Sequence, residues 1–159
     1  MVVNRVFNKE KGYGSLSFFF ISMGIITVID QVSKWLVISR FYPGGSRVLI
    51  DGFLYLTYVQ NRGAAFGILQ GKGLVFIVIS SLIVGGIIIY NIRYPISFFT
   101  RLVMGIIAGG ALGNLIDRWQ YNYVVDFLDL GWWPVFNIAD IAIVCGGIVL
   151  AWHLLVLDG

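Results

Sequence analysis

Four long apolar runs constrain this chain more than any other feature. They extend from about Leu16 to Ile38, Leu74 to Tyr90, Ile96 to Ile116 and Phe136 to Leu157. Each is close to the ~20 residues that a helix needs to cross the hydrocarbon of a bilayer. Of the 159 residues, 58% are hydrophobic and only 12% are charged, whereas a soluble domain is roughly a quarter charged. We predict one integral membrane domain over residues 1–159, an all-α protein with four transmembrane helices.

The first run follows three basic residues, a pattern that is also typical of a signal peptide. It lacks a small-residue cleavage site and continues through Asp30 and Lys34 into more apolar sequence, so we expect a transmembrane helix. Four spans place both termini on one side. The positive-inside rule does not say which side, because five lysines and arginines fall on each.

The segment between the first two runs has a different character. Residues 47–59 are rich in β-branched and aromatic side chains and contain Asp51-Gly52, a strong hairpin-turn signal. We predict a small antiparallel β-cradle over about residues 41–66, outside the hydrocarbon. At the headgroup level, where aromatic residues concentrate, we expect Phe53, Tyr55, Tyr58, Tyr121, Tyr123, Trp132 and Trp133.

Polar side chains gather at the edges of the apolar runs, on the side to which the cradle leaves the membrane. They are Asn61, Asn114, Asp117, Asp126, Asn137 and Asp140. Ionisable groups near a bilayer are costly and rarely persist without a partner or a task. Two close carboxylates also push their pKa values apart, which acid–base chemistry can use. If the fold brings Asp126 and Asp140 together, they could share a proton and activate water against a peptide carbonyl.

Two other interpretations of these aspartates stay open from the residues alone. Each could cap a helix or pair with a nearby cation such as Lys34, Arg62 or Arg118. Asn137 and Asp140 stand three residues apart at a predicted helix start, where both residue types serve as caps. Intramembrane aspartates are also common in transporters, which form the rival functional class.

A histidine- or cysteine-based site is not expected. His153, the one histidine, lies thirteen residues after Asp140, roughly 20 Å along a common helix. Cys145 lies in an apolar run, where we expect it to be buried and inert. Because it is the one cysteine, an intrachain disulfide is excluded. The scattered basic residues give no sign of nucleic-acid binding.

Taken in order, five short motifs resemble those of the lipoprotein signal peptidases, the type II signal peptidases of bacteria. The motifs are Asp30-Gln-Val-Ser-Lys34, Asn61-Arg-Gly-Ala-Ala-Phe66, Gly109-Gly-Ala-Leu-Gly-Asn114-Leu-Ile-Asp117-Arg118, Val124-Val-Asp126-Phe127 and Pro134-Val-Phe-Asn137-Ile-Ala-Asp140. Each motif is weak by itself, but five in this order on four spans are highly specific. The resemblance covers about residues 20 to 150.

The resemblance implies an aspartic endopeptidase that removes the signal peptide from diacylglyceryl-modified prolipoproteins, cutting before the lipidated cysteine. It implies a multi-pass protein of the bacterial cytoplasmic membrane, with both termini in the cytoplasm and the cradle and active site at the extracytoplasmic face. Its expected partners are the lipidated precursor and membrane lipids. No cofactor, metal or nucleic acid is expected, and the chain is expected to be a monomer.

The same resemblance assigns roles to individual residues. Asp126 and Asp140 match the family's catalytic pair. The residues expected to bind substrate or support the site are Asn61, Asn114, Asp117, Arg118 and Asn137. Asp30 and Lys34, one helical turn apart, can pair on one face and are expected to brace the polar end of the first span. Only thirteen residues separate Asp126 from Asp140, a shorter loop than the family usually has. We expect the shorter loop to reduce the lid over the site and not to move the pair.

Overall fold

The computed structural model describes residues 16–63 and 73–156. Within them, four helices and three strands follow in the order α2 (Leu16–Ile38), β1 (Ser46–Ile50), β2 (Leu54–Asn61), α3 (Gly73–Arg93), α4 (Phe98–Tyr121), β3 (Val124–Asp129) and α5 (Ile138–Val156). All four helices are long and apolar enough to cross a membrane. The four predicted spans are therefore confirmed, with boundaries that differ by a few residues at most helix ends.

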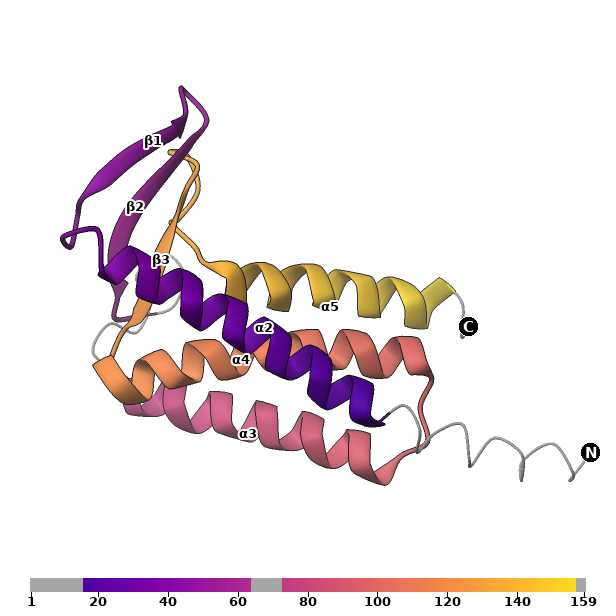
Figure 1. The fold of residues 1–159 in the computed structure, drawn as a ribbon. Helices are drawn as coiled ribbons and strands as arrows, with labels where there is room; N and C mark the ends of the chain where they lie inside the picture. Colours follow the sequence, from indigo (N-terminus) through magenta and orange to yellow (C-terminus); the bar gives the residue numbers. More distant parts are fainter. Residues whose placement is uncertain (1–15, 64–72, 157–159) are drawn as a thin grey trace, which may run out of the picture.

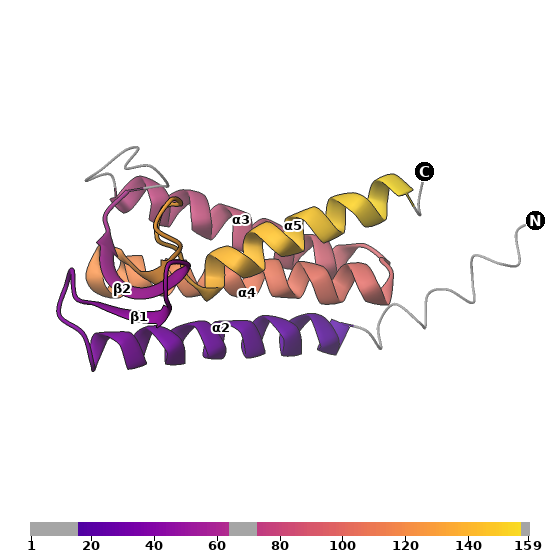
Figure 2. The ribbon, with the colours of Figure 1, turned by 90° about the horizontal axis from the view of Figure 1, so that it is seen from above.

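The helices run side by side, and the sheet lies at one end of them (Figure 1). We call this the sheet end of the bundle. The start of α2 and the end of α5 lie at the opposite end, as an even number of spans requires (Figures 1 and 2). His153, near the end of α5, packs against Phe99 with ring centroids 4.7 Å apart. It therefore lies far from the sheet end, as the sequence predicts.

Helix α4 is the centre of the bundle because its glycines let two neighbours approach closely. Gly105, Gly109 and Gly113 recur every four residues on the face toward α2, and a Cβ at Gly109 would lie 2.5 Å from the Met23 carbonyl oxygen. Gly110 meets α5 in the same way, since its Cβ would lie 2.6 Å from the Ala139 carbonyl oxygen. Small residues at such contacts are typical of membrane helices that pack backbone to backbone.

The predicted hairpin is present and its turn follows the expected chemistry. Gly52 takes a φ of +69°, in the left-handed region, and the Phe53 amide donates to the Ile50 carbonyl oxygen at 3.1 Å. The strands β1 and β2 lie within the predicted range of the β-cradle, and the part of that range from residue 64 to residue 66 falls outside the described residues.

A third strand, which we did not predict, completes the sheet. Strand β3 pairs antiparallel with β2 and places Val59 opposite Asp126, so the sheet order is β1-β2-β3. The segment carrying Asp126 is therefore part of the cradle and not only an interfacial connection. Its pairing with β2 joins residues more than sixty positions apart, and no local turn signal announces such a contact.

The sheet is attached to the bundle through a small apolar core. Its buried members are Val37 at the end of α2, Tyr58 on β2, and Val125 and Phe127 on β3. Tyr58 is only 3% exposed, so its ring fills this core and does not face the headgroups directly. The expectation that Cys145 is buried is wrong, because this residue lies on the exposed face of α5.

Candidate active site

Asp126 lies on β3, where the residue is only 2% exposed and its carboxylate is held by two amides. Asn61, at the end of the neighbouring strand β2, donates through Nδ2 to Oδ2 at 2.8 Å. Asn137 donates through Nδ2 to Oδ1 at 2.7 Å. Both oxygens of the carboxylate therefore have a fixed partner, and the pairing of β2 with β3 brings Asn61 to this position.

Asp140 lies in the first turn of α5 and makes a reciprocal cap with Asn137. The Asp140 amide donates to Asn137 Oδ1 at 2.9 Å, and the Asn137 amide donates to Asp140 Oδ2 at 3.2 Å. These bonds satisfy backbone groups at the helix start that would otherwise lack partners. The capping interpretation is thus correct, but it does not use up Asp140: its Oδ1 also accepts a hydrogen bond from Asn114 Nδ2 at 2.9 Å.

Two asparagine side chains join the two carboxylates into one network. Asn137 Nδ2 lies within hydrogen-bonding distance of Asp126 Oδ1, of Asn114 Oδ1 at 3.1 Å and of the Val125 carbonyl oxygen at 3.3 Å. Asn114 in turn donates to Asp140. Asn137 is fully buried and Asn114 is 6% exposed. The structure therefore brings together Asn61, Asn114, Asp126, Asn137 and Asp140, as the sequence motifs predict.

The pKa of Asp126 is raised from its ordinary value of 3.8 to about 7. Burial is the main cause because it disfavours the charged carboxylate, and the negative charge of Asp140 adds to the effect. The bonds from Asn61 and Asn137 oppose the rise without cancelling it. Near neutral pH, Asp126 therefore holds a proton in a large fraction of molecules, which is what a general acid needs.

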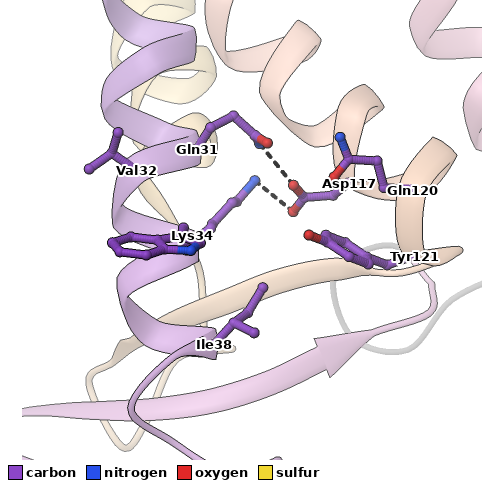
Figure 3. Close-up of a pocket in the computed structure, with 8 residues that line it drawn as sticks. Gln31, Val32, Lys34, Ile38, Asp117, Gln120 and Tyr121 are labelled. Carbon is purple, nitrogen blue, oxygen red and sulfur yellow. Dashed lines mark hydrogen bonds and ion pairs between the residues drawn. The ribbon is translucent and has the colours of Figure 1, made fainter.

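A buried ion cluster supports the site from the α2 side. Lys34 Nζ lies 2.8 Å from Asp30 Oδ2 and 2.9 Å from Asp117 Oδ2, and all three side chains are at most 2% exposed. Figure 3 shows Lys34 and Gln31 reaching from α2 to Asp117 on α4, beside a cavity of about 310 Å³. The predicted pairing of Asp30 with Lys34 is confirmed.

Of the three cations that the sequence left open as partners of the aspartates, Lys34 is the ion-pair partner of Asp117. Arg118, its neighbour in sequence, is not. Successive residues on a helix point in different directions, and the packing of α4 against α2 turns Asp117 toward Lys34. Asp117 Oδ2 also accepts a hydrogen bond from the Val125 amide at 3.0 Å. It therefore ties the helix bundle to β3, one residue before Asp126.

The ion cluster braces more than the cradle. Asp30 Oδ1 accepts a hydrogen bond from the Ala139 amide at 3.0 Å, one residue before Asp140. Asp30 and Lys34 therefore hold α2, α4 and the start of α5 together. Gln31 is a residue to which we gave no role, although it lies inside the first motif: its Nε2 donates to Asp117 Oδ1 at 2.9 Å and to the Gly113 carbonyl oxygen at 3.1 Å.

Arg118 faces α3 and the edge of the site. Its guanidinium lies 5.0 Å from the centre of the Phe76 ring and 3.4 Å from the Asn114 carbonyl oxygen, and it is within Coulombic range of Asp140 and Asp126. Arg62 is exposed. Residues 64–66 of the second motif lie outside the described residues. In residues 16–63 and 73–156, no three His, Cys, Asp or Glu side chains form a group suited to a metal ion.

Four apolar helices, with the buried Asp126 and the half-buried Asp140 at one end of them, are the features of a multi-pass membrane protein with an aspartic hydrolase site. Comparison with known proteins agrees: residues 22–156 match the family described as Signal peptidase (SPase) II. The chain belongs to this family of lipoprotein signal peptidases, aspartic peptidases that cleave signal peptides from lipid-modified prolipoproteins.

Individual relatives give the same result. The chain is 55% identical to a lipoprotein signal peptidase of Syntrophomonas wolfei over 89% of its own length and 94% of the relative. It is 50% identical to a lipoprotein signal peptidase of Moorella thermoacetica over 85% and 91%. A bacterial membrane enzyme solved by the in meso method is 32% identical, with a TM-score of 0.80 and 88% of each chain covered. Of the functional classes that the residues left open, these findings support the peptidase.

Proposed function

We propose that Asp126 and Asp140 are the catalytic pair that hydrolyses the peptide bond before the lipidated cysteine. The observation that carries this assignment is the network in which Asn137 bonds to both residues, while Asn61 and Asn114 fix the outer oxygen of one carboxylate each. Side chains held in this way are oriented before substrate arrives, which is what lowers the entropic part of the barrier.

The raised pKa of Asp126 supports a division of labour within the pair. Asp126 supplies a proton to the reaction and Asp140 accepts one. A water oxygen attacks the carbonyl carbon, its proton passes to Asp140, and the proton of Asp126 passes to the carbonyl oxygen. The diol then collapses: Asp140 returns its proton to the leaving nitrogen, the C–N bond breaks, and Asp126 recovers a proton from the diol hydroxyl.

We further propose that the sheet end faces the extracytoplasmic side of the bacterial cytoplasmic membrane, with the site at the depth of the headgroups. Exposed aromatic side chains near the sheet end support that depth, since such rings favour the membrane–water interface. They are Trp119, Tyr121, Trp132 and Trp133. At this depth the acyl chains of the precursor lie in lipid beside the helices, while water reaches the scissile bond. The active unit is a monomer.

The test is cleavage of a lipidated precursor by purified Asp126→Asn and Asp140→Asn. Each variant should lose at least about 1,000-fold in turnover, because an amide cannot exchange the proton that the mechanism needs. Asp51→Asn is the matched control, since Asp51 is an exposed carboxylate in the hairpin turn; its turnover should equal that of the parent enzyme. Thermal unfolding must show that all three variants are folded. Substantial turnover by either dyad variant would rule the assignment out.

A further inference from the structure

All three ammonium hydrogens of Lys34 have an acceptor, and one of these acceptors is a side chain that bonds to the proposed catalytic pair. An ammonium group has three donors and no acceptor. Lys34 Nζ contacts Asp30 Oδ2 at 2.8 Å, Asp117 Oδ2 at 2.9 Å and Asn114 Oδ1 at 2.9 Å. The first two contacts neutralise buried charge. The third touches a side chain that bonds directly to Asp140.

The amide of Asn114 has two possible orientations, and its surroundings permit one. Its oxygen receives hydrogen bonds from Lys34 Nζ and Asn137 Nδ2, and its nitrogen donates to Asp140 Oδ1. Turned by half a rotation, the amide would place its NH₂ group against the Lys34 ammonium and the Asn137 NH₂. Its oxygen would then face a carboxylate. The flipped amide would be repelled on both sides. Of the two groups that now donate to the Asn114 oxygen, Lys34 would repel the NH₂ group more strongly than Asn137, because Lys34 carries a full positive charge.

We propose that Lys34 is a positioning residue of the peptidase, whose ammonium selects the orientation of the Asn114 amide that donates to Asp140. Lys34 contacts neither carboxylate of the proposed pair: its charge lowers the pKa of Asp126 from a distance, and its one hydrogen bond toward the pair goes to Asn114. The inference rests on the proposed function, because the orientation of Asn114 matters to the reaction only if Asp140 reacts. It extends the structural role that the sequence gives to Lys34, since the same ammonium serves both purposes.

Another buried cation, Arg101 on α4, has a purely structural role. Arg101 is 4% exposed, and its guanidinium donates to the backbone oxygens of Asn91 at 2.6 Å and Tyr94 at 3.1 Å, at the end of α3. It caps a helix end at the opposite end of α4 from Asn114. Arg101→Met therefore removes a buried cation without touching the site, and it is the matched control.

Lys34→Met is the direct test, but it leaves Asp30 and Asp117 buried without their cation and can fail to fold. The double variant Asp30→Asn/Lys34→Met leaves only Asp117 without its cation. It removes one positive and one negative charge, so the net charge of the cluster stays the same. An asparagine at position 30 can still accept the Ala139 hydrogen bond, and Asp117 keeps its bonds from Gln31 and the Val125 amide. Asp30→Asn alone serves as the reference for the double variant.

The readouts are kcat, KM and the pH dependence of kcat/KM for cleavage of a lipidated precursor by the full-length enzyme in one detergent. Relative to Asp30→Asn, the double variant should lose about 100-fold in kcat, the size expected for a misplaced catalytic group, with little change in KM. The acid limb of the pH profile should move to higher pH, because an amide oxygen turned toward the pair favours its protonated state. Loss of the Lys34 charge, which lowers the pKa of Asp126, acts in the same direction, so the part that runs through Asn114 is the part that an Asn114→Ala background removes. Arg101→Met should leave the profile where it was.

A double-mutant cycle separates action through Asn114 from general support. In an Asn114→Ala background, removal of Lys34 should cost little further kcat. Independent, multiplicative effects would overturn the proposal, as would an unshifted pH profile and parental kcat in the folded double variant. A failure of the catalytic assignment gives a different result, since Asp126→Asn or Asp140→Asn would then retain turnover whatever the Lys34 variants do.

Discussion

Helices α3 and α4 both qualify as membrane spans, yet they occupy opposite kinds of position. In the most apolar stretch of α3 only 6% of residues are buried within the protein, whereas in α4 the share is 56%. Of the four helices, α3 is the most hydrophobic and α4 the least. A helix surrounded by lipid gains from being apolar all round, whereas a central helix meets other protein and can carry polar groups.

The glycines of the two helices differ in the same way. No described atom lies within 4 Å of a Cβ built on Gly85 or Gly86 of α3, whereas a Cβ on Gly109 of α4 would collide with backbone of α2. Asn114, Asp117 and Arg118, which hold the site together, all lie on α4. The comparison shows that hydropathy identifies the spans, while the departures from it identify the helix on which the site is built.

The largest effect that separates the two helices should come from one added methyl group. Gly109→Ala would place a Cβ 2.5 Å from the Met23 carbonyl oxygen and 3.0 Å from Ile26 Cβ. Backbone cannot move aside cheaply, so we expect the free energy of unfolding to fall by about 3 kcal/mol. Turnover should also fall, because α2 carries Lys34 to α4. Thermal unfolding and precursor cleavage in the same detergent measure both effects.

Gly86→Ala is the control on α3. It adds the same methyl group where no described atom outside its own stretch of helix lies within 4 Å. Stability should therefore change by less than about 1 kcal/mol and in the favourable direction, since alanine is the better helix former. Equal effects at Gly109 and Gly86 would mean that the close approach of α2 and α4 does not limit stability.

A smaller effect is expected from Asp117→Asn on α4. The substitution removes the charge that faces Lys34 but leaves the Lys34–Asp30 pair in place. We expect unfolding to become easier by about 2 kcal/mol, the range for a hydrogen bond to a charged group. Turnover should fall less than in Asp126→Asn or Asp140→Asn, because Asp117 supports β3 and is not in the proposed pair. A folded Asp117→Asn enzyme as inactive as Asp140→Asn would place Asp117 in the catalytic pair.

The smallest effect, counted per pH unit, concerns the pH dependence of stability, which should arise beside α4 and not from α3. The folded chain keeps a proton on Asp126 up to about pH 7, whereas the unfolded chain releases it near the ordinary value of 3.8. Stability from this group is therefore present at low pH and lost as the pH rises through that window, by at most about 1.4 kcal/mol per pH unit. Melting temperatures between pH 5 and pH 8 measure it. The slope should flatten in Asp126→Asn; a slope that persists in that variant would place its origin elsewhere.

Much of this protein can be predicted from the sequence because the controlling physics is local. A run of about 20 apolar residues needs hydrocarbon around it whatever its neighbours are, so the four spans follow from composition and length. Asp51-Gly52 determines the hairpin because glycine tolerates the positive φ that the turn requires. The order of five short motifs identified the family and, with it, the residues that gather at the sheet end.

Only the tertiary structure decided how these pieces face one another. Strand β3 exists because β2 offers it a partner across more than sixty residues. Asp117 pairs with Lys34 and not with Arg118 because close packing at the α4 glycines turns that face of the helix toward α2. Tyr58 is buried because its strand packs against the end of α2 and against β3, and Cys145 is exposed because it lies on the outer face of α5. An apolar pattern indicates that a helix lies in a membrane. It does not indicate which faces of the helix contact lipid and which contact protein, because both surroundings are similarly apolar.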